Sequence, residues 1–210
     1  MIKILIADDH AIVREGLKQI LAETADMLVA GEATNGREVL ERVRKEDFDL
    51  VLLDIAMPGK DGLETLKELK LEKSKLPVLV LSIYPEEQYA VRLLKAGAAG
   101  YLTKESAPEE LIAAIRKVSQ KGKYISASLA EKLAFYLETD VEKPVHEMLS
   151  DREHKVMLLI ASGKTVTEIA DEMCLSIKTI STYRVRALNK MGLKNNAEFT
   201  YYALKHGLVD

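Results

Sequence analysis

Five short apolar runs alternate with helical patterns along the first 121 residues, and this alternation is the strongest constraint on the fold. The runs are rich in Val, Ile and Leu, and they cover residues 2–7, 27–33, 49–54, 77–82 and 99–103. Three of them are almost continuously apolar, as expected for strands that are buried on both faces of a parallel sheet. Five strand–helix repeats predict a doubly wound α/β domain, in which functional groups collect at the carboxyl ends of the strands.

The rest of the chain has a different pattern. Residues 122–144 are predicted to be a linker that contains a helical segment and ends in charged residues and a proline. Four helical patterns and no strand-like run occupy residues 145–210. Ser150 and Thr165 each stand three residues before a glutamate, a spacing that predicts capped helix starts. The sequence therefore predicts a second, all-α domain over residues 145–210.

Composition limits the class of protein. The chain has 210 residues, 48% of them hydrophobic, with a net charge of −3, which is typical of an ordinary globular protein. The single cysteine, Cys174, excludes an internal disulfide and is expected to be a small buried residue. No apolar run approaches the roughly 18 residues of a membrane span, and acidic residues follow the first strand too early for a signal peptide. We therefore expect a cytoplasmic protein that does not contact a membrane.

Charged and polar side chains stand where four of the predicted strands end. Asp8 and Asp9 follow the first strand, Asp54 ends the third, and Ser82 and Lys104 come at the ends of the fourth and fifth. If the first and third strands are neighbours, the three carboxylates converge and repel one another unless a cation neutralises them, and such oxygen ligands suit Mg²⁺. The alternative is that one acid of the pair caps a helix and Asp54 starts a turn. Five polar groups at one edge favour the site.

A locally basic helix stands out in the second domain. Between residues 178 and 194 the charged residues are all basic, which suggests a polyanionic partner, although such a run alone is more often a solvated surface. At about 100° per residue, Ala187 and Met191 share the side of Ile180 and are expected to face the core. The opposite side carries a mixture of polar, apolar and basic residues: Lys178, Ser181, Thr182, Val185, Arg186 and Asn189. That mixture suits base edges and phosphates in a DNA major groove.

Specific motifs add a resemblance to a known family. The segments IADDH, LLDIAMPGKDG and GYLTKES, together with Ser82, resemble a receiver domain of the CheY type. Residues 145–210 resemble a LuxR-type helix-turn-helix domain throughout. With both domains, the chain is identified as a member of the two-component response regulators of the NarL/FixJ subfamily.

The resemblance implies a role for each receiver residue. Asp54 would accept a phosphoryl group from a sensor histidine kinase, with Lys104 and the Ser82 hydroxyl stabilising it. Asp9, Asp54 and the backbone carbonyl of Ala56 would bind Mg²⁺ directly, and Asp8 would act through water or from the second layer of ligands. Tyr101 would turn inward when Ser82 moves toward the phosphoryl group. The alternative for Tyr101 is an ordinary half-buried strand aromatic.

The resemblance also implies double-stranded DNA as a partner, bound by a homodimer, and it allows RNA polymerase as a further partner. The residues expected to contact DNA are Lys178, Thr179, Ser181, Thr182, Val185, Arg186 and Lys190. Arg184 lies near the core edge of the same helix and is expected to reach outward to phosphate. The final helix, residues 196–206, would pair two copies through Phe199, Tyr202, Ala203 and Leu204. Alternatively, these side chains close the core of their own domain.

The predicted function is a transcription regulator, not an enzyme, whose DNA binding is controlled by phosphorylation. Three alternatives remain. An Asp-nucleophile phosphatase needs a cap domain, for which no segment is left, and a phosphorelay intermediate would leave the second domain without a role. The third is a phosphorylation-independent DNA-binding regulator with a structural receiver domain.

Overall fold

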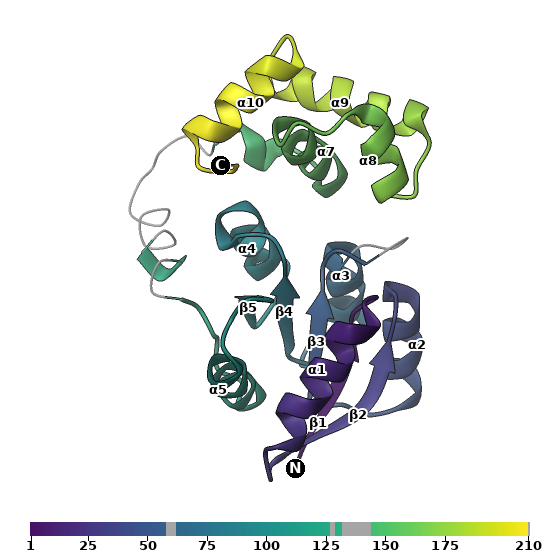
Figure 1. The fold of residues 1–210 in the computed structure, drawn as a ribbon, viewed down its shortest axis with the longest axis vertical. Coiled ribbons are helices and arrows are strands. Elements are labelled where there is room, and N and C mark those ends of the chain that lie inside the picture. Colours follow the sequence, from purple (N-terminus) through teal and green to yellow (C-terminus); the bar gives the residue numbers. More distant parts are fainter. Residues whose placement is uncertain (58–61, 127–128, 132–143, 210) are drawn as a thin grey trace. The chain divides into compact units, whose positions relative to one another are not determined.

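The computed structural model describes the chain in four stretches: residues 1–57, 62–126, 129–131 and 144–209. The chain divides into two compact units, Met1–Leu133 and Ala134–Asp210 (Figure 1). Within the described stretches, no helix combines the length and apolar character needed to cross a bilayer.

The first unit contains a five-stranded parallel sheet with the strand order β2-β1-β3-β4-β5. Its strands are β1 (Ile2–Ala7), β2 (Met27–Ala33), β3 (Leu50–Asp54), β4 (Val78–Ser82) and β5 (Gly100–Thr103). They coincide with the five predicted apolar runs to within one residue at each end. Every residue of β3 and β4 is buried, as the continuous apolar pattern of these runs predicts. The doubly wound α/β prediction is confirmed, and β1 and β3 are neighbours.

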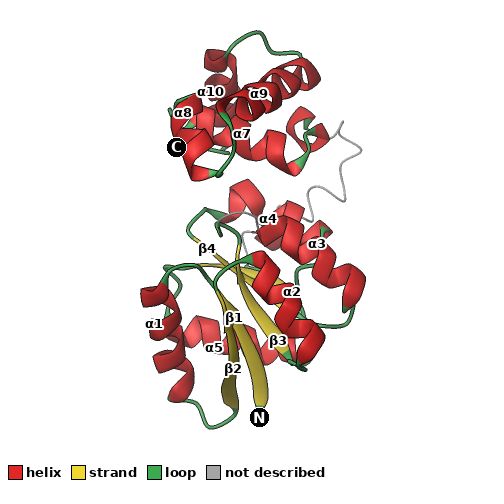
Figure 2. Ribbon diagram, turned by 90° about the vertical axis from the view of Figure 1, so that its right-hand side faces the viewer, coloured by secondary structure: helices red, strands yellow, loops and turns green. Residues whose placement is uncertain are grey.

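Helices cover both faces of this sheet. They are α1 (Ala11–Ala22), α2 (Gly36–Lys45), α3 (Gly62–Glu72), α4 (Glu86–Lys95) and α5 (Pro108–Ser119). Figure 2 shows α1 and α5 on one side of the sheet and α2 and α3 on the other. Because β-strand side chains alternate between faces, Ile4 and Ile6 pack in one core cluster with Leu17 of α1 and Ile115 of α5. This packing fixes the strand ends, and the loops after them, at one edge.

The segment after α5 also packs on the first unit. The Tyr124 N–H donates to the Ala99 carbonyl over 2.9 Å, and Tyr124 forms a parallel bridge with Gly100 on the free edge of β5. Residues 129–131 are helical, in agreement with the predicted helical segment, most of which lies outside the described residues. The first part of the predicted linker is therefore held against the sheet.

The second unit is helical throughout its described part. Its elements are the 3₁₀ helix η1 (Val145–Met148) and the α-helices α7 (Asp151–Ala161), α8 (Val166–Glu172), α9 (Ile177–Met191) and α10 (Asn196–Lys205). Ser150 and Thr165 form the predicted capping boxes with the glutamates three residues later. Gly192 ends α9 in the left-handed conformation, φ 69°, that favours glycine.

The expectation that Cys174 is buried is wrong. Its side chain is exposed, and its backbone adopts a left-handed φ of 52° in the turn between α8 and α9. The neighbouring Met173 is buried instead. The turn therefore places its core contact one residue earlier, which hydrophobicity alone does not reveal.

Candidate functional site

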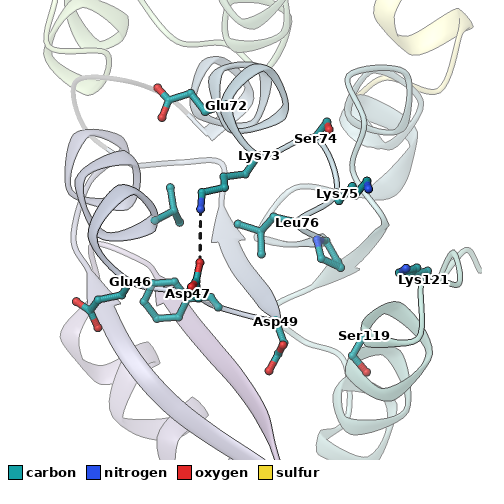
Figure 3. Close-up of a pocket in the computed structure, with 13 residues that line it drawn as sticks. Glu46, Asp47, Asp49, Glu72, Lys73, Ser74, Lys75, Leu76, Ser119 and Lys121 are labelled. Carbon is teal, nitrogen blue, oxygen red and sulfur yellow. Dashed lines mark hydrogen bonds and ion pairs between the residues drawn. The ribbon is translucent and has the colours of Figure 1, made fainter.

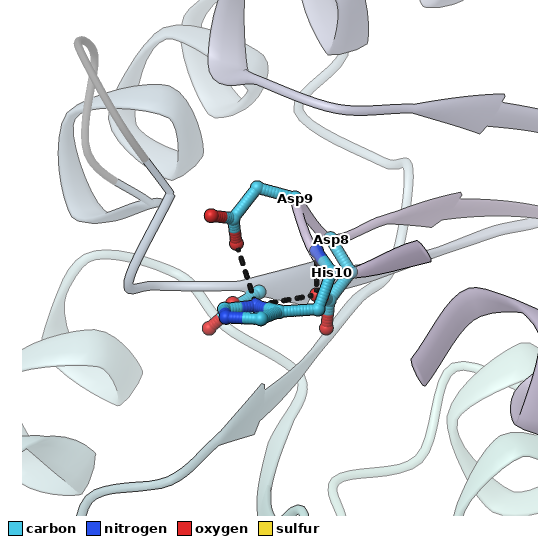
Figure 4. A group of neighbouring side chains, drawn as sticks. Asp8, Asp9 and His10 are labelled. Atoms are coloured by element: carbon cyan, nitrogen blue, oxygen red, sulfur yellow. Dashed lines mark hydrogen bonds and ion pairs between the residues drawn. The ribbon is translucent and has the colours of Figure 1, made fainter. Parts of the chain in front are cut away.

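The loop after β1 and the end of β3 bring four potential ligand residues together. One oxygen or nitrogen atom from each of Asp8, Asp9, His10 and Asp54 lies within 4.8 Å of the others. Asp8 and Asp54 are buried, whereas Asp9 is partly exposed and His10 is exposed. Figure 4 shows the first three of these side chains clustered after the strand. The strand order thus produces the convergence that the sequence pattern predicts.

The Asp54 carboxylate has two close donors. The Ala56 N–H donates to Asp54 Oδ1 over 2.9 Å, and Lys104 Nζ donates to Asp54 Oδ2 over 2.8 Å. The same ammonium lies 2.6 Å from Asp8 Oδ2. Lys104 is held here because its own N–H donates to the Ser82 carbonyl, which extends the pairing of β4 and β5 by one residue. One lysine therefore bridges two buried carboxylates.

Electrostatics in this pocket leave negative charge uncompensated. Burial raises the pKa of Asp54, and this influence outweighs the opposing effects of Lys104 and the Ala56 N–H, while the charge of Asp8 raises it further. Burial opposes the charge of Lys104, but its bonds to Asp54 and Asp8 are stronger together and raise its pKa. The lysine therefore remains an ammonium at neutral pH, and it is a single cation among three carboxylates.

Two buried carboxylate oxygens of the cluster lie where a divalent cation would contact them. Asp8 Oδ2 and Asp9 Oδ1 are buried and accept no hydrogen bond of good geometry from the described residues, and the close partner of Asp8 Oδ2 is the Lys104 ammonium at 2.6 Å. His10 Nδ1 lies 2.9 Å from Asp9 Oδ1 and 3.3 Å from Asp8 Oδ1. Buried carboxylate oxygens are hard ligands, so the cluster fits a divalent cation such as Mg²⁺.

Ser82 and Tyr101 meet through a residue that the sequence analysis did not single out. The Tyr84 N–H donates to Ser82 Oγ over 3.0 Å, and the Tyr101 hydroxyl donates to the Tyr84 carbonyl over 2.6 Å. Tyr101 is only 1% exposed, so its ring already lies inward and is not a half-buried strand aromatic. Both contacts use the main chain of Tyr84, and no side-chain pattern could have indicated them.

Arg14 also supports the site without having been predicted. Its guanidinium donates to the Asp8 carbonyl over 2.8 Å and contacts Glu32 of β2 over 3.0 Å. Arg14 therefore fixes the main chain that carries Asp8. The sequence feature that could have indicated this role is the position of Arg14, one turn into the helix that follows Asp8 and Asp9.

The exposed face of α9 matches the prediction. Ile180, Ala187 and Met191 are buried. Of the residues expected to contact DNA, most are exposed and two are half-buried: Lys178, Thr182, Val185, Arg186 and Lys190 are exposed, and Thr179 and Ser181 are intermediate. Their contact with DNA stays a prediction.

Two basic residues of α9 have partners within the second unit. Lys190 Nζ donates to Oε2 of the buried Glu153 over 2.6 Å. Arg184 Nε donates over 2.5 Å to Oδ1 of Asn196, the first residue of α10. Both side chains thus link α9 to neighbouring helices, and their contact with DNA stays a prediction.

The final helix divides its apolar residues between two roles. Phe199 and Ala203 are completely buried in the core of the second unit, and the Tyr202 hydroxyl pairs with His146 Nδ1 over 2.9 Å. Leu204 is 51% exposed and Tyr201 is 71% exposed. The alternative role in core closure therefore holds for Phe199 and Ala203, and pairing of two copies through Leu204 stays a prediction.

A separate cavity of about 480 Å³ opens at the opposite edge of the sheet, where β3 and β4 begin (Figure 3). Phe48 and Leu76 line it, together with an ion pair in which Lys73 Nζ lies 3.5 Å from Asp47 Oδ1. Acidic and basic residues are mixed around it. It shares no residue with the carboxylate site.

Comparison with known proteins decides the family. Residues 4–116 match the response regulator receiver domain, and residues 147–203 match the bacterial regulatory proteins of the luxR family. The response regulator GacA of Pseudomonas aeruginosa is 38% identical over 211 aligned residues, which cover 100% of this chain and 99% of that protein. The chain belongs to the response regulator family.

Further relatives agree on the NarL/FixJ type of this response regulator. The response regulator UvrY of Escherichia coli is 35% identical and is covered over 97% of its length. The solved structure of RcsB from Salmonella enterica serovar Typhimurium has a TM-score of 0.66 and 29% identity, with 96% of this chain and 98% of that chain covered. The response regulator thus combines a receiver domain with a LuxR-type DNA-binding domain and acts in transcription regulation.

Proposed function

We propose that Asp54 accepts a phosphoryl group from a sensor histidine kinase and thereby controls sequence-specific DNA binding by the second domain. The observation that carries this proposal is the buried Asp54 carboxylate, which shares a single ammonium with Asp8 at the carboxyl ends of the strands. The negative charge of Asp54 is only partly neutralised in the resting protein. Carboxylates of this kind are typical of functional sites, where a bound ligand or a reaction neutralises the remaining charge.

The transfer uses few groups of the protein. An Asp54 oxygen attacks the phosphorus of the kinase phosphohistidine, so that a P–O bond forms while the P–N bond breaks and the departing imidazole takes a proton from solvent. Lys104 lies 2.8 Å from Asp54 as an ammonium and would neutralise a phosphoryl oxygen, and the Ser82 hydroxyl would donate to another. The protein thus promotes the transfer by positioning the reacting groups and by stabilising their charge.

The carboxylate cluster would also hold a cofactor. Asp9, Asp54 and the Ala56 carbonyl would bind Mg²⁺ directly, and Asp8 would bind through water. When bound, the ion supplies charge neutralisation to the carboxylates and to the transferring group. The support for Mg²⁺ is the cluster of three carboxylates around one lysine, in which the buried oxygens Asp8 Oδ2 and Asp9 Oδ1 have ion-pair contacts with Lys104 and His10 but no hydrogen bond of good geometry from the described residues.

The DNA partner follows from α9 and from the relatives. RcsB has been solved on the promoter rprA in the presence of the phosphomimetic BeF3⁻. In this chain, Lys178, Thr182, Val185 and Arg186 form the exposed face that would enter a major groove. One short helix makes few base contacts, so two half-sites bound by a homodimer are expected. A kinase donor and a DNA target imply a cytoplasmic location, with RNA polymerase as a further partner.

A binding experiment tests the proposal. Duplexes are selected from a random pool by the full chain treated with acetyl phosphate and Mg²⁺, and the selected duplex is then titrated at one salt concentration. We expect treatment to tighten binding by the wild-type chain and to leave Asp54→Asn unchanged. The fragment 145–210 is expected to bind without treatment. Equal affinity of treated and untreated wild-type chain would instead support the phosphorylation-independent regulator.

A further inference from the structure

The segment that leaves the receiver domain is held on the free edge of β5. The Tyr124 N–H donates to the Ala99 carbonyl over 2.9 Å, and Lys123 Nζ donates to the Ala98 carbonyl over 2.6 Å. Gly100 makes this approach feasible, because a Cβ at that position would lie 2.7 Å from the Tyr124 carbonyl oxygen and 2.9 Å from its Cβ. The residues leading to the second domain are therefore packed on the sheet at this point.

Two side chains attach this segment to different helices. The Tyr124 hydroxyl donates to Glu110 Oε1 of α5 over 2.9 Å. The Ser126 hydroxyl donates to Oε2 of Glu86, the first residue of α4, over 2.6 Å. Ser126 Oγ also accepts the Leu129 N–H over 3.1 Å, and Leu129 is only 1% exposed. Ser126 thus joins Leu129, in the helical residues 129–131, to the beginning of α4.

The beginning of α4 is connected to the phosphorylation site. Tyr84, two residues before Glu86, donates its N–H to Ser82 Oγ and accepts the Tyr101 hydroxyl at its carbonyl. A displacement of Ser82 toward Asp54 therefore moves the main chain of Tyr84, and Glu86 follows in the same short segment. The Tyr124–Glu110 bond is attached to α5 and has no place in this series of contacts.

We propose that the Ser126–Glu86 hydrogen bond is a latch that holds the linker on the receiver domain. Phosphorylation of Asp54 opens this latch. The inference rests on the proposed function and adds the route by which the site acts on the linker. The latched arrangement pairs Ser82 Oγ with the Tyr84 N–H. Engagement of Ser82 by the phosphoryl group shifts the start of α4, breaks the Glu86 contact and frees the linker. A bound or attached group shifts the equilibrium between two conformations only if its interactions differ between them. In this proposal, the Ser126–Glu86 hydrogen bond is present in one conformation and absent in the other.

Breaking the latch by mutation tests this route in the full chain. Glu86→Ala removes the acceptor and leaves the Ser126 cap on Leu129 intact, which makes it cleaner than Ser126→Ala. Loss of a hydrogen bond to a charged, partly exposed group is expected to change the latch equilibrium about threefold to tenfold. Without phosphorylation, Glu86→Ala should therefore speed amide exchange at Leu129 and Ala130 and tighten binding to the selected duplex by a similar factor. The further increase in DNA affinity that acetyl phosphate treatment produces should be smaller in Glu86→Ala by the same factor.

Two variants serve as controls. Tyr124→Phe loses the hydroxyl bond to Glu110 and should keep the wild-type gain on phosphorylation, and Ser126→Thr keeps a hydroxyl and should behave like the wild-type chain. The latch would be overturned if Glu86→Ala showed the same amide exchange, and the same increase in DNA affinity on phosphorylation, as the wild-type chain. It would also be overturned if Tyr124→Phe lost as much of that increase as Glu86→Ala. Intact mass and the gain of the wild-type chain are measured alongside. If the wild-type chain is phosphorylated and binds DNA more tightly as a result, a negative result for Glu86→Ala contradicts the latch alone. If phosphorylation does not tighten binding by the wild-type chain, the proposed function is contradicted. The amide-exchange measurement then tests the Glu86 contact separately.

Discussion

Two buried carboxylates, one in each unit, show opposite electrostatic behaviour. Asp54 in the receiver domain is completely buried, and Glu153 at the start of α7 is 3% exposed. Burial works against ionisation in both cases. For Glu153, however, the bonds from Lys190 and from the Ser150 N–H outweigh burial and lower its pKa, whereas for Asp54 burial prevails and the pKa is raised.

The difference separates a structural acid from the acid that we propose accepts the phosphoryl group. Glu153 closes a capping box and has its own ammonium from Lys190, at 2.6 Å. Asp54 shares Lys104 with Asp8 and stands among further acids. A buried carboxylate with an ammonium of its own stabilises a fold, whereas one that shares its ammonium with a second buried acid keeps an unfavourable charge that a bound cation or a covalent change can relieve.

Removing the satisfied acid should have the largest effect on stability. Glu153→Ala leaves the Ser150 N–H and Lys190 without their partner, so we expect the second unit to lose about 2–3 kcal/mol of unfolding free energy. Denaturant unfolding of the full chain, with amide exchange to assign the transition to α7–α10, measures it. Lys155→Ala, on the same helix, is the control. A loss no larger than that of the control would show that the two carboxylates do not differ in this way.

Adding Mg²⁺ should stabilise only the receiver domain. At a Mg²⁺ concentration ten times its Kd, linkage predicts about 1.4 kcal/mol of added stability for the first unit. Asp9→Ala should remove most of this gain because a ligand and a charge disappear together. Asp47→Ala, which removes an almost completely exposed acid at the other edge of the sheet, should retain it. An undiminished gain in Asp9→Ala would contradict the assigned ligand.

Neutralising Asp54, which shares its ammonium with Asp8, should have a small effect of the opposite sign. Asp54→Asn relieves repulsion with Asp8 and keeps an oxygen to accept the Ala56 N–H. We therefore expect the stability of the first unit without Mg²⁺ to stay constant or rise by about 1 kcal/mol. Thermal unfolding in chelator-treated buffer measures this change. A destabilisation comparable to that of Glu153→Ala would mean that Asp54 is also a structural acid.

Acid titration should produce the smallest effect and separate the two units by sign. The contribution of Glu153 is complete above its ordinary pKa near 4.5 and is lost as the pH falls through its lowered folded pKa. The folded pKa of Asp54 is raised above its ordinary 3.8, so the destabilising contribution of its charge is relieved as the pH falls through the raised value. Glu153→Gln and Asp54→Asn should each flatten the stability profile of their own unit, as followed by amide exchange. Unchanged profiles would contradict the assigned directions.

The sequence predicted the parts of the molecule that depend on residue type and period. Continuous apolar runs located β3 and β4, and the parallel strand order then made Asp8 and Asp54 converge. Capping boxes at Ser150 and Thr165 followed from a spacing that forms local hydrogen bonds.

The remaining features depend on loop geometry and side-chain reach. Tyr84 connects Ser82 and Tyr101 through main-chain atoms, which carry no sequence signature. Lys190 donates to Glu153, 37 positions away in the sequence, and the basic pattern of its own helix gave no sign of this contact. The exposure of Cys174 follows from a left-handed backbone that its residue type does not favour.

The central claim is that Asp54 is the functional acid of the pair, and direct mapping of the phosphoryl group tests it. The full chain is incubated with acetyl phosphate and Mg²⁺, and intact mass and peptide masses are recorded for the wild-type chain, Asp54→Asn and Glu153→Gln. We predict one added phosphoryl group, located on Asp54, in the wild-type chain and in Glu153→Gln, and none in Asp54→Asn. Phosphorylation of Asp54→Asn at the wild-type rate, or a phosphoryl group located on another residue of the wild-type chain, would contradict the account.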